Sequence, residues 1–94
     1  MAGEMRIVKD SLFAKYGLRC EVCKKEFSEE ELTGHHIIMQ CRGGPTTEKN
    51  ILLACVKCHF EVINKIEYGT EEYWELMNEC LKHRQKEENK MNAY

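Results

Sequence analysis

Residues 20–59 read CEVCKKEFSEEELTGHHIIMQCRGGPTTEKNILLACVKCH, and the fold depends on this segment. It contains two Cys-x-x-Cys pairs, Cys20 with Cys23 and Cys55 with Cys58. A two-residue gap lets both sulfurs of a pair point at one ion from a tight turn, and two pairs complete a tetrahedral zinc site. Because four protein ligands leave zinc no open position, we expect a structural Zn²⁺ here.

The cysteines are more typical of a metal site than of disulfides. The chain has 94 residues, six of them cysteine, and a domain this small needs a staple for its core. The N-terminal residues MAGEMRIVKDSLF carry charges throughout, unlike a signal peptide, and no stretch is apolar enough to cross a membrane. A redox or disulfide pair is the alternative, but a thioredoxin-like βαβ pattern is absent. We therefore expect a cytoplasmic protein in which Cys20, Cys23, Cys55 and Cys58 hold zinc, an arrangement that we call the zinc knot.

Two cysteines and one histidine remain outside these patterns. Cys41 and Cys80 lie in apolar contexts, so we expect both to be small buried hydrophobes. A role as a ligand is the alternative, mainly for Cys41, which lies close to the histidines. His83 lies on the polar side of the last expected helix, and we expect no functional role for it.

Hydrophobic periodicity predicts the elements that surround the first half of the segment. Apolar side chains at helical spacing predict a helix over 7–16, with Gly17 at its C-terminal cap. The run HHIIMQC predicts a short strand over 35–41. Residues 51–54 are apolar and predict a second strand, or a turn that runs into the second cysteine pair.

Two further helices are expected after the second strand. Residues 56–67 fit one helix, and a C-terminal helix is expected over about 70–85. The polar tail, about 86–94, is expected to fray. The apolar face of the C-terminal helix is expected to be core or a dimer surface, and comprises Tyr73, Trp74, Met77, Cys80 and Leu81. The elements together predict the α+β class, with a helix on each side of the central motif.

Three histidines and one asparagine have a spacing that suits metal and acid–base chemistry. His35 and His36 are adjacent, so on a strand their side chains point to opposite faces and do different work. His59 directly follows the last cysteine, which would place its ring rigidly. A neutral imidazole is a suitable general base near neutral pH and a common ligand of divalent metals.

The whole arrangement resembles a known family. The order of the two cysteine pairs, His35-His36, the glycines 43–44, Asn50 and His59, over about residues 18–66, is similar to the HNH endonuclease motif in its zinc-containing form. The resemblance implies a small ββα-metal (His-Me finger) fold, stapled by the four-cysteine knot. The length of 94 residues fits one domain, so we expect a single domain over 1–94.

The resemblance also implies roles for individual residues. His36 matches the general base that activates water, and His35 and His59 match the ligands of a catalytic divalent metal. Asn50 matches the residue that braces the loop between the strands and helps orient the base. The glycines 43–44 match the turn that folds this loop back over the site.

The identity of the catalytic metal is left open by the sequence. Two imidazoles favour Mn²⁺, Ni²⁺, Co²⁺ or Zn²⁺, although Mg²⁺ can be held partly by substrate phosphate. Many family members have another His or Asn one helical turn after the ligand matched by His59. Here that position is Ile63, with Asn64 beside it, so we expect two firm protein ligands completed by water or Asn64.

The distribution of charged residues indicates how strongly the protein could bind nucleic acid. The net charge is −2, but residues 1–25 carry six Lys and Arg against three acids, and residues 35–66 carry four against two. Arg42 and Lys57 are the main candidates for holding phosphates, with solvated surface charges as the alternative. We therefore expect weak, salt-sensitive binding to DNA, most naturally duplex DNA, with low intrinsic sequence specificity.

Three functions are compatible with these features. The favoured one is a metal-dependent endonuclease, from a bacterium or phage, that nicks or cuts DNA. The second is a zinc-stabilised module that binds nucleic acid or protein without catalysis. The third is a zinc-ribbon protein that docks onto a partner, or onto a second copy, through its acidic C-terminal helix. An intact His36 favours the enzyme, because a binding module has no need of a base.

Overall fold

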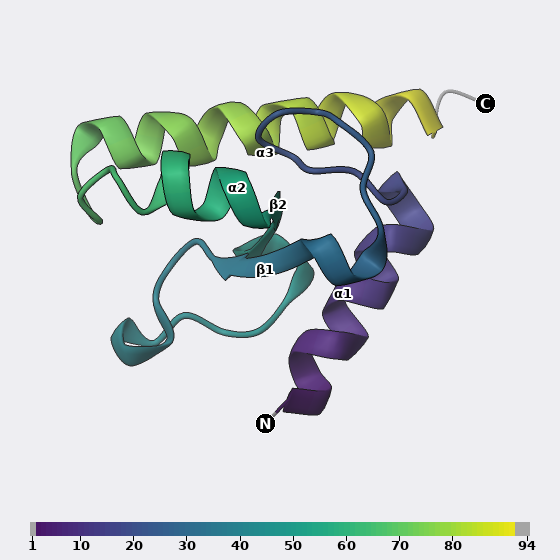
Figure 1. The fold of residues 1–94 in the computed structure, drawn as a ribbon, viewed down its shortest axis with the longest axis horizontal. Helices are drawn as coiled ribbons and strands as arrows, with labels where there is room; N and C mark the ends of the chain where they lie inside the picture. The colour runs from purple at the N-terminus through teal and green to yellow at the C-terminus, as the bar shows by residue number, and fades with distance from the viewer. Residues whose placement is uncertain (1, 92–94) are drawn as a thin grey trace.

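A two-stranded antiparallel sheet lies at the centre of the computed structural model, which describes residues 2–91 (Figure 1). Strand β1 (Leu32–His36) pairs with β2 (Ile51–Cys55). Helix α1 (Ala2–Tyr16) lies on one side of the sheet, whereas α2 (Val56–Cys58) and α3 (Glu71–Met91) lie on the other (Figure 1). This is the α+β arrangement expected of a ββα-metal fold.

Strand β2 forms the centre of the core, and all five of its residues are buried. Its side chains alternate between the two faces. Leu52 and Ala54 join the apolar cluster against α3, while Ile51 and Leu53 join the cluster against α1. The apolar run 51–54 is therefore a strand covered on both sides, which resolves the alternative left open by the sequence.

Strand β1 is shifted from its expected position. It was expected over 35–41, but it spans Leu32–His36, and His36 is the last residue paired, opposite Ile51. The ladder ends there because the backbone N–H and C=O of Ile38 bond to the side chain of Asn50 instead of a strand. Residues 37–50 form a loop that contains two short 3-10 turns, η2 (Gln40–Arg42) and η3 (Glu48–Asn50).

Helix α1 confirms the expected C-terminus and begins earlier than expected. It ends at Tyr16, and Gly17 follows with φ of 85°, a left-handed conformation that glycine adopts without strain. The Gly17 N–H donates to Phe13 O at 2.8 Å. At its other end the helix extends back to Ala2, although periodicity predicted only 7–16.

The segment after the second cysteine pair is not one regular helix. The helix expected over 56–67 consists of α2 and a π-helical turn, η4 (His59–Ile63), closed by the Asn64 N–H donating to His59 O at 3.0 Å. The wider turn keeps Cys58 at the knot while Ile63 enters the core, where it is 2% exposed. Asn64, five residues beyond His59, is exposed.

Helix α3 is longer than its apolar pattern predicted. It was expected over about 70–85 with a frayed tail over 86–94, but it continues to Met91. Its last turns gain from polar pairs one turn apart, such as Gln85 Nε2 donating to Asn89 at 3.2 Å. Residues 92–94 of the expected tail lie outside the described residues.

The apolar face of α3 is core, as expected: Tyr73, Met77 and Cys80 are buried against the sheet. Cys80 thus confirms the prediction of a small buried hydrophobe. The same prediction was wrong for Cys41, which is exposed because it lies in η2, on the loop rather than on a strand. Among residues 2–91, no helix combines the length and apolar character needed to cross a bilayer.

A buried ion pair links α3 to the first cysteine pair. The guanidinium of Arg84 bonds to both carboxylate oxygens of Glu21 and donates to the backbone oxygens of Glu48 (2.6 Å) and Ile51 (2.7 Å). Glu21 in turn accepts from the Leu53 N–H at 2.8 Å. The side chains of Arg84 and Glu21 are only 8% and 12% exposed, so α3 is tied to β2 and to the cysteine turn at one point.

Candidate metal centre and histidine site

The structure brings all four expected zinc ligands together. The Sγ atoms of Cys20, Cys23, Cys55 and Cys58 all lie within 4.8 Å of one another. Each pair forms a turn in which backbone N–H groups point at the first sulfur. Cys23 N lies 3.4 Å from Cys20 Sγ, and Cys58 N lies 3.4 Å from Cys55 Sγ. The local geometry predicted from the two-residue spacing is therefore present.

The electrostatics of this cluster suit a divalent cation. Burial raises the pKa of the Cys58 and Cys23 thiols, and the neighbouring Cys20 sulfur raises the pKa of both further. Burial also opposes ionisation of Cys20, but N–H groups donated to its sulfur outweigh this and lower its pKa. Four crowded sulfurs become thiolates together only when a positive ion balances them. Four thiolates in this arrangement form the donor set that structural Zn²⁺ prefers.

His35 and His59 form a second, more open pair beside the knot. His35 lies on β1, and His59 is the residue after the last zinc cysteine. Their ring centroids are 5.3 Å apart with an interplanar angle of 67°. Burial lowers the pKa of His35 to about 4, helped by His59 and His36, so this ring is neutral near pH 7. A neutral imidazole has a lone pair available for a metal.

Each ring of this pair contacts a hydroxyl group. His35 Nε2 lies 2.8 Å from the hydroxyl of Tyr73 on α3. His59 Nδ1 lies 3.3 Å from Oγ1 of Thr33, two residues before His35 on β1. Sequence reasoning missed both contacts. Tyr73 had been recognised only as an apolar core position, and no role had been assigned to Thr33. A polar hydroxyl at a position expected to be buried was the available signal.

His36 lies apart from this pair. It follows His35 on β1, so its side chain points to the other face of the strand, as the two-residue period predicted. Its Nε2 lies 3.0 Å from Oγ1 of Thr46 in the loop. The structure therefore brings His35 and His59 together and holds His36 at the end of the same strand against a different partner.

Asn50 braces the loop, as expected. It is 6% exposed. Its Oδ1 accepts from Ile38 N at 2.9 Å, and its Nδ2 donates to Ile38 O at 3.0 Å and to Pro45 O at 2.9 Å. Gly44 packs against the same backbone, where a Cβ would lie 1.8 Å from Ile38 O. Gly43, with φ of 86°, makes the turn that brings this contact about.

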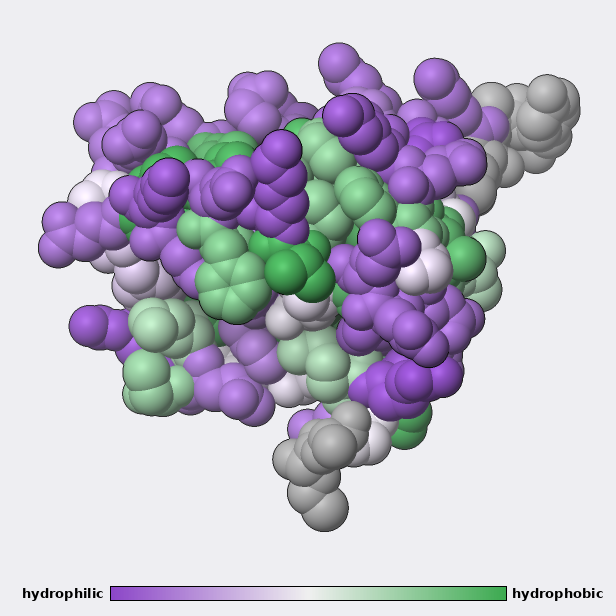
Figure 2. All heavy atoms as spheres, in the orientation of Figure 1, coloured by the Kyte–Doolittle hydropathy of each residue, from purple (hydrophilic) through white to green (hydrophobic). Residues whose placement is uncertain are grey.

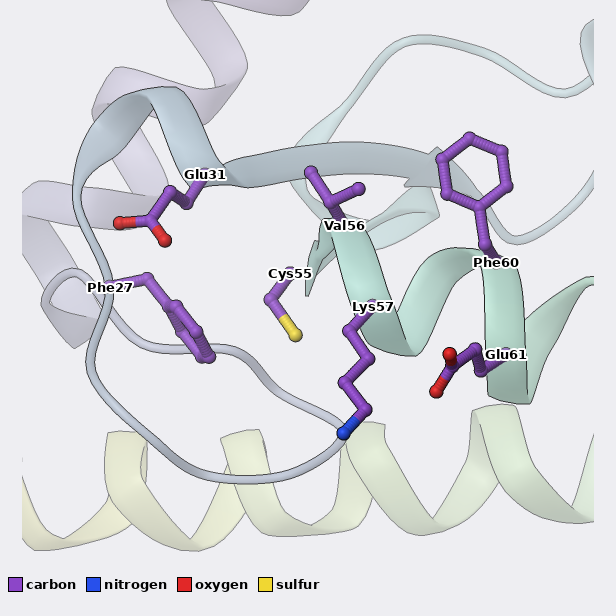
Figure 3. A pocket seen from close by; sticks show the side chains of 7 residues that line it. All are labelled: Phe27, Glu31, Cys55, Val56, Lys57, Phe60 and Glu61. Atoms are coloured by element: carbon purple, nitrogen blue, oxygen red, sulfur yellow. The ribbon is translucent and has the colours of Figure 1, made fainter.

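The candidate phosphate-binding residues are exposed and lie apart. Arg42 ends η2, with its guanidinium 5.8 Å from the centre of the Tyr68 ring. Lys57 projects from α2 along an open groove (Figure 3). Both side chains are accessible to an anion, and Arg42 also has an aromatic support.

The groove beside the knot is mainly apolar. Phe27 of the cysteine turn and Phe60 of η4 lie at its opposite ends, with Val56 and Cys55 between them (Figure 3). Val56 and Phe60 are 46% and 61% exposed. In Figure 2 the face over α3 is mostly hydrophilic, and apolar groups gather below it, around α2 and β1. The expected partner surface on α3 thus presents polar and charged groups, because its apolar face is buried in the core.

Comparison with known proteins identifies the central segment. The family model described as HNH endonuclease matches residues 20–64, which span both cysteine pairs, the three histidines and Asn50. A search of curated proteins gave no match. The match covers β1, β2 and the turn after the last cysteine, and leaves α1 and α3 outside it. Residues 20–64, which include the four-cysteine cluster and both strands of the ββα arrangement, therefore match the HNH endonuclease family.

Proposed function

We propose that the protein is a metal-dependent endonuclease that hydrolyses phosphodiester bonds of DNA. The observation that carries the proposal is the pairing of the His35 and His59 rings, 5.3 Å apart, beside a four-cysteine cluster that fixes the start of the helix bearing His59. We further propose that residues 1–94 act as one domain. The two apolar clusters support this, since they join α1 and α3 to the same sheet.

His35 and His59 are the proposed protein ligands of the catalytic divalent metal. When bound, the ion would act as a Lewis acid toward the phosphate and the leaving oxygen. Two neutral imidazoles leave several positions for water and phosphate, whereas the four thiolates of the knot leave none. The donor set favours Mn²⁺, Ni²⁺ or Zn²⁺, and Mg²⁺ remains usable where the substrate supplies oxygen ligands.

His36 is the proposed general base, and Asn50 holds the loop that faces it. A neutral imidazole at the end of β1 can take a proton from the attacking water. Nε2 of His36 lies 3.0 Å from the hydroxyl of Thr46, so the water either displaces Thr46 or contacts Nδ1. Arg42 and Lys57, both exposed, are the proposed phosphate contacts.

The proposed substrate is duplex DNA, bound with low sequence specificity. The segments that carry the cysteines and histidines have an excess of basic residues, whereas the segment that forms most of α3 is acidic. Contacts from a few lysines and arginines to phosphates give weak, salt-dependent affinity. We propose that the protein acts in the cytoplasm of a bacterium or in phage infection.

A nicking assay on supercoiled plasmid tests the proposal. Zinc-loaded protein, freed of loosely bound ions, is assayed alone and with Mg²⁺, Mn²⁺, Ni²⁺ or Zn²⁺ added. We expect nicking that depends on an added metal and falls by about 10²–10⁴-fold in His36→Ala, the typical contribution of a general base.

The matched control for this assay is His83→Ala, because His83 lies on α3 away from the paired rings. It should keep wild-type activity. Nicking that survives in His36→Ala would assign the base to another residue. Metal-dependent DNA binding without any nicking would favour a binding module without catalysis.

A further inference from the structure

The hydroxyl of Tyr73 contacts a backbone oxygen and a histidine ring nitrogen. It lies 2.7 Å from the backbone oxygen of Ile37 and 2.8 Å from Nε2 of His35. A carbonyl oxygen only accepts hydrogen bonds, and a phenol has one proton to donate. The Tyr73 proton therefore points at Ile37, and the Tyr73 oxygen accepts from His35. This arrangement places the ring proton of neutral His35 on Nε2 and its lone pair on Nδ1.

Thr33 stands in the same relation to His59. Its Oγ1 donates to the backbone oxygen of Ala54 at 2.8 Å and lies 3.3 Å from Nδ1 of His59. Since the single hydroxyl proton is used by Ala54, Oγ1 accepts from His59. The proton of neutral His59 is then on Nδ1 and its lone pair is on Nε2. The two rings of the pair thus have opposite tautomers. Each tautomer is fixed by a hydroxyl group that donates its own proton to a backbone oxygen.

Both hydroxyls are held in place by the fold. Tyr73 is 1% exposed, and its ring packs against Tyr68 and Trp74 with centroids 4.9 Å away in each case. Thr33 is fixed by the strand pairing, in which it lies opposite Ala54. Neither side chain can reorient without losing a backbone hydrogen bond, so the preference of each ring is built into the metal-free protein.

We propose that Tyr73 and Thr33 are positioning residues that set the tautomers of His35 and His59 and present one lone pair from each ring to the same divalent cation. The inference rests on the proposed function for the meaning of the cation site. It makes α3, which lies outside the family match at residues 20–64, part of the metal site. A ligand histidine generally donates its other ring N–H to a neighbour that orients it and raises its basicity.

The test reads the tautomers directly, by long-range ¹H–¹⁵N spectra of the histidine rings. The sample is zinc-loaded protein without a second metal, at pH 7.5. We expect wild-type His35 as the Nε2–H form and His59 as the Nδ1–H form. Tyr73→Phe should turn His35 into a mixture while His59 keeps its form. Wild-type rings in the opposite tautomers, or a His35 unchanged by Tyr73→Phe, would overturn the inference.

Two further variants separate positioning from general destabilisation. Tyr68→Phe removes a hydroxyl from the same aromatic cluster without touching His35, and it should leave both tautomers unchanged. Thr33→Ser keeps the hydroxyl and should preserve the Nδ1–H form of His59, whereas Thr33→Val should not. A His59 tautomer that is the same in all three Thr33 proteins would contradict the role of Thr33.

Calorimetric titration with Ni²⁺ supplies a readout independent of DNA cleavage. We expect Tyr73→Phe to weaken Ni²⁺ binding about 10–100-fold, the usual cost of losing the partner of a ligand histidine. Tyr68→Phe should bind as the wild type does, and equal weakening in both variants would contradict the inference. Predicted tautomers in a protein that never nicks DNA would refute the proposed function alone. Nicking by a protein with the opposite tautomers would refute this inference alone.

Discussion

The cysteine knot and the histidine pair, the two proposed metal sites, are neighbours that are built in different ways. In the knot, each Cys-x-x-Cys turn orients its own sulfurs through N–H groups within three residues. In the histidine pair, the ring of His35 is oriented by Tyr73, 38 residues away on another element. The geometry within each cysteine pair is specified by local sequence, whereas the contact that orients His35 exists only once α3 has packed on the sheet.

Under the proposed function, the cysteine knot has a structural role and the histidine pair a catalytic one. A closed set of four thiolates holds its ion tightly and gives it no room for substrate. Two imidazoles hold an ion more weakly and leave positions for water and phosphate. Because His59 directly follows Cys58, the closed site fixes one half of the open site. The comparison predicts that damage to the knot destroys both sites, while damage to the histidine pair leaves the fold intact.

Removal of zinc from the knot is expected to have the largest effect. A structural zinc site contributes roughly 10 kcal/mol or more, comparable with the whole stability of a small domain. A strong chelator, or Cys58→Ser, should therefore abolish the cooperative thermal transition seen by far-UV circular dichroism. Mass spectrometry should find about one zinc per wild-type chain.

The control for the knot is Cys41→Ser, at an exposed cysteine of η2. It should keep the zinc, and its Tm should stay within about 4 °C of the wild type, as for most surface substitutions. A metal-free protein with an unchanged melting transition would show that zinc bound by the knot does not stabilise the fold.

The buried ion pair that joins the two regions comes next in size. Arg84→Met leaves the carboxylate of Glu21 buried without its partner, and we expect a loss of about 3–5 kcal/mol in the free energy of unfolding. Urea denaturation at saturating zinc measures it. The double variant Arg84→Met/Glu21→Gln removes the stranded charge and should recover part of the loss. Equal stability of the single and double variants would show that the charge pairing contributes little.

Local sequence was enough to predict the knot and the strand faces. The two-residue spacing of the cysteines determines where their sulfurs point, and the two-residue period of a strand separates His35 from His36. Gly17 likewise ended α1 where a left-handed residue was expected. Each of these features depends on residues within a few positions of one another. The meeting of the two distant cysteine pairs was predicted from the four ligands that structural zinc needs.

The features that were missed depend on distant contacts. The end of β1 at His36 is set by the Asn50 side chain, which captures the backbone of Ile38 from 12 residues away. The role of the Tyr73 hydroxyl requires α3 to lie beside β1, and the continuation of α3 to Met91 has no apolar periodicity to reveal it. Helix propensity and residue spacing do not predict contacts between distant residues, because these contacts form only when the chain packs.

Gly44→Ala is expected to have a moderate effect, confined to the loop that carries the Asn50 brace. The added Cβ would lie 1.8 Å from Ile38 O and 2.9 Å from Asn50 Nδ2, so backbone must move. We expect a loss of about 1–3 kcal/mol, as for overpacking elsewhere, with the zinc content unchanged. Urea denaturation and metal analysis give the two readings.

Gly3→Ala is the matched control for the loop variant. Gly3 lies in α1 with no atom within 4 Å of the position of an added Cβ, so the change should stabilise the protein slightly. If Gly44→Ala were as stable as wild type, the close approach of the loop to Ile38 would not be required.

The smallest expected effect concerns an exposed ion pair outside the cysteine knot and the histidine pair. Lys15 Nζ lies 2.9 Å from Glu48 Oε1, and the hydrogen bond to Glu48 raises the pKa of Lys15. A raised pKa for a base means that the folded state binds the proton more tightly than the unfolded state. The stabilisation is therefore complete below the ordinary value of 10.5 and is lost as pH rises through the higher folded value.

Glu48→Gln tests this pH dependence, because it removes the charge that holds the Lys15 proton and keeps the backbone oxygen that Arg84 uses. Wild type should be slightly more stable than the variant in urea between about pH 8 and pH 10, and the two should converge as the pH rises through the raised folded pKa of Lys15. High salt should shrink the difference, since the pair is exposed to solvent. A difference that grew with alkaline pH would mean that Glu48 acts through a group other than Lys15. Because the pair touches neither the knot nor the histidines, zinc content should be the same in both proteins at every pH of the series.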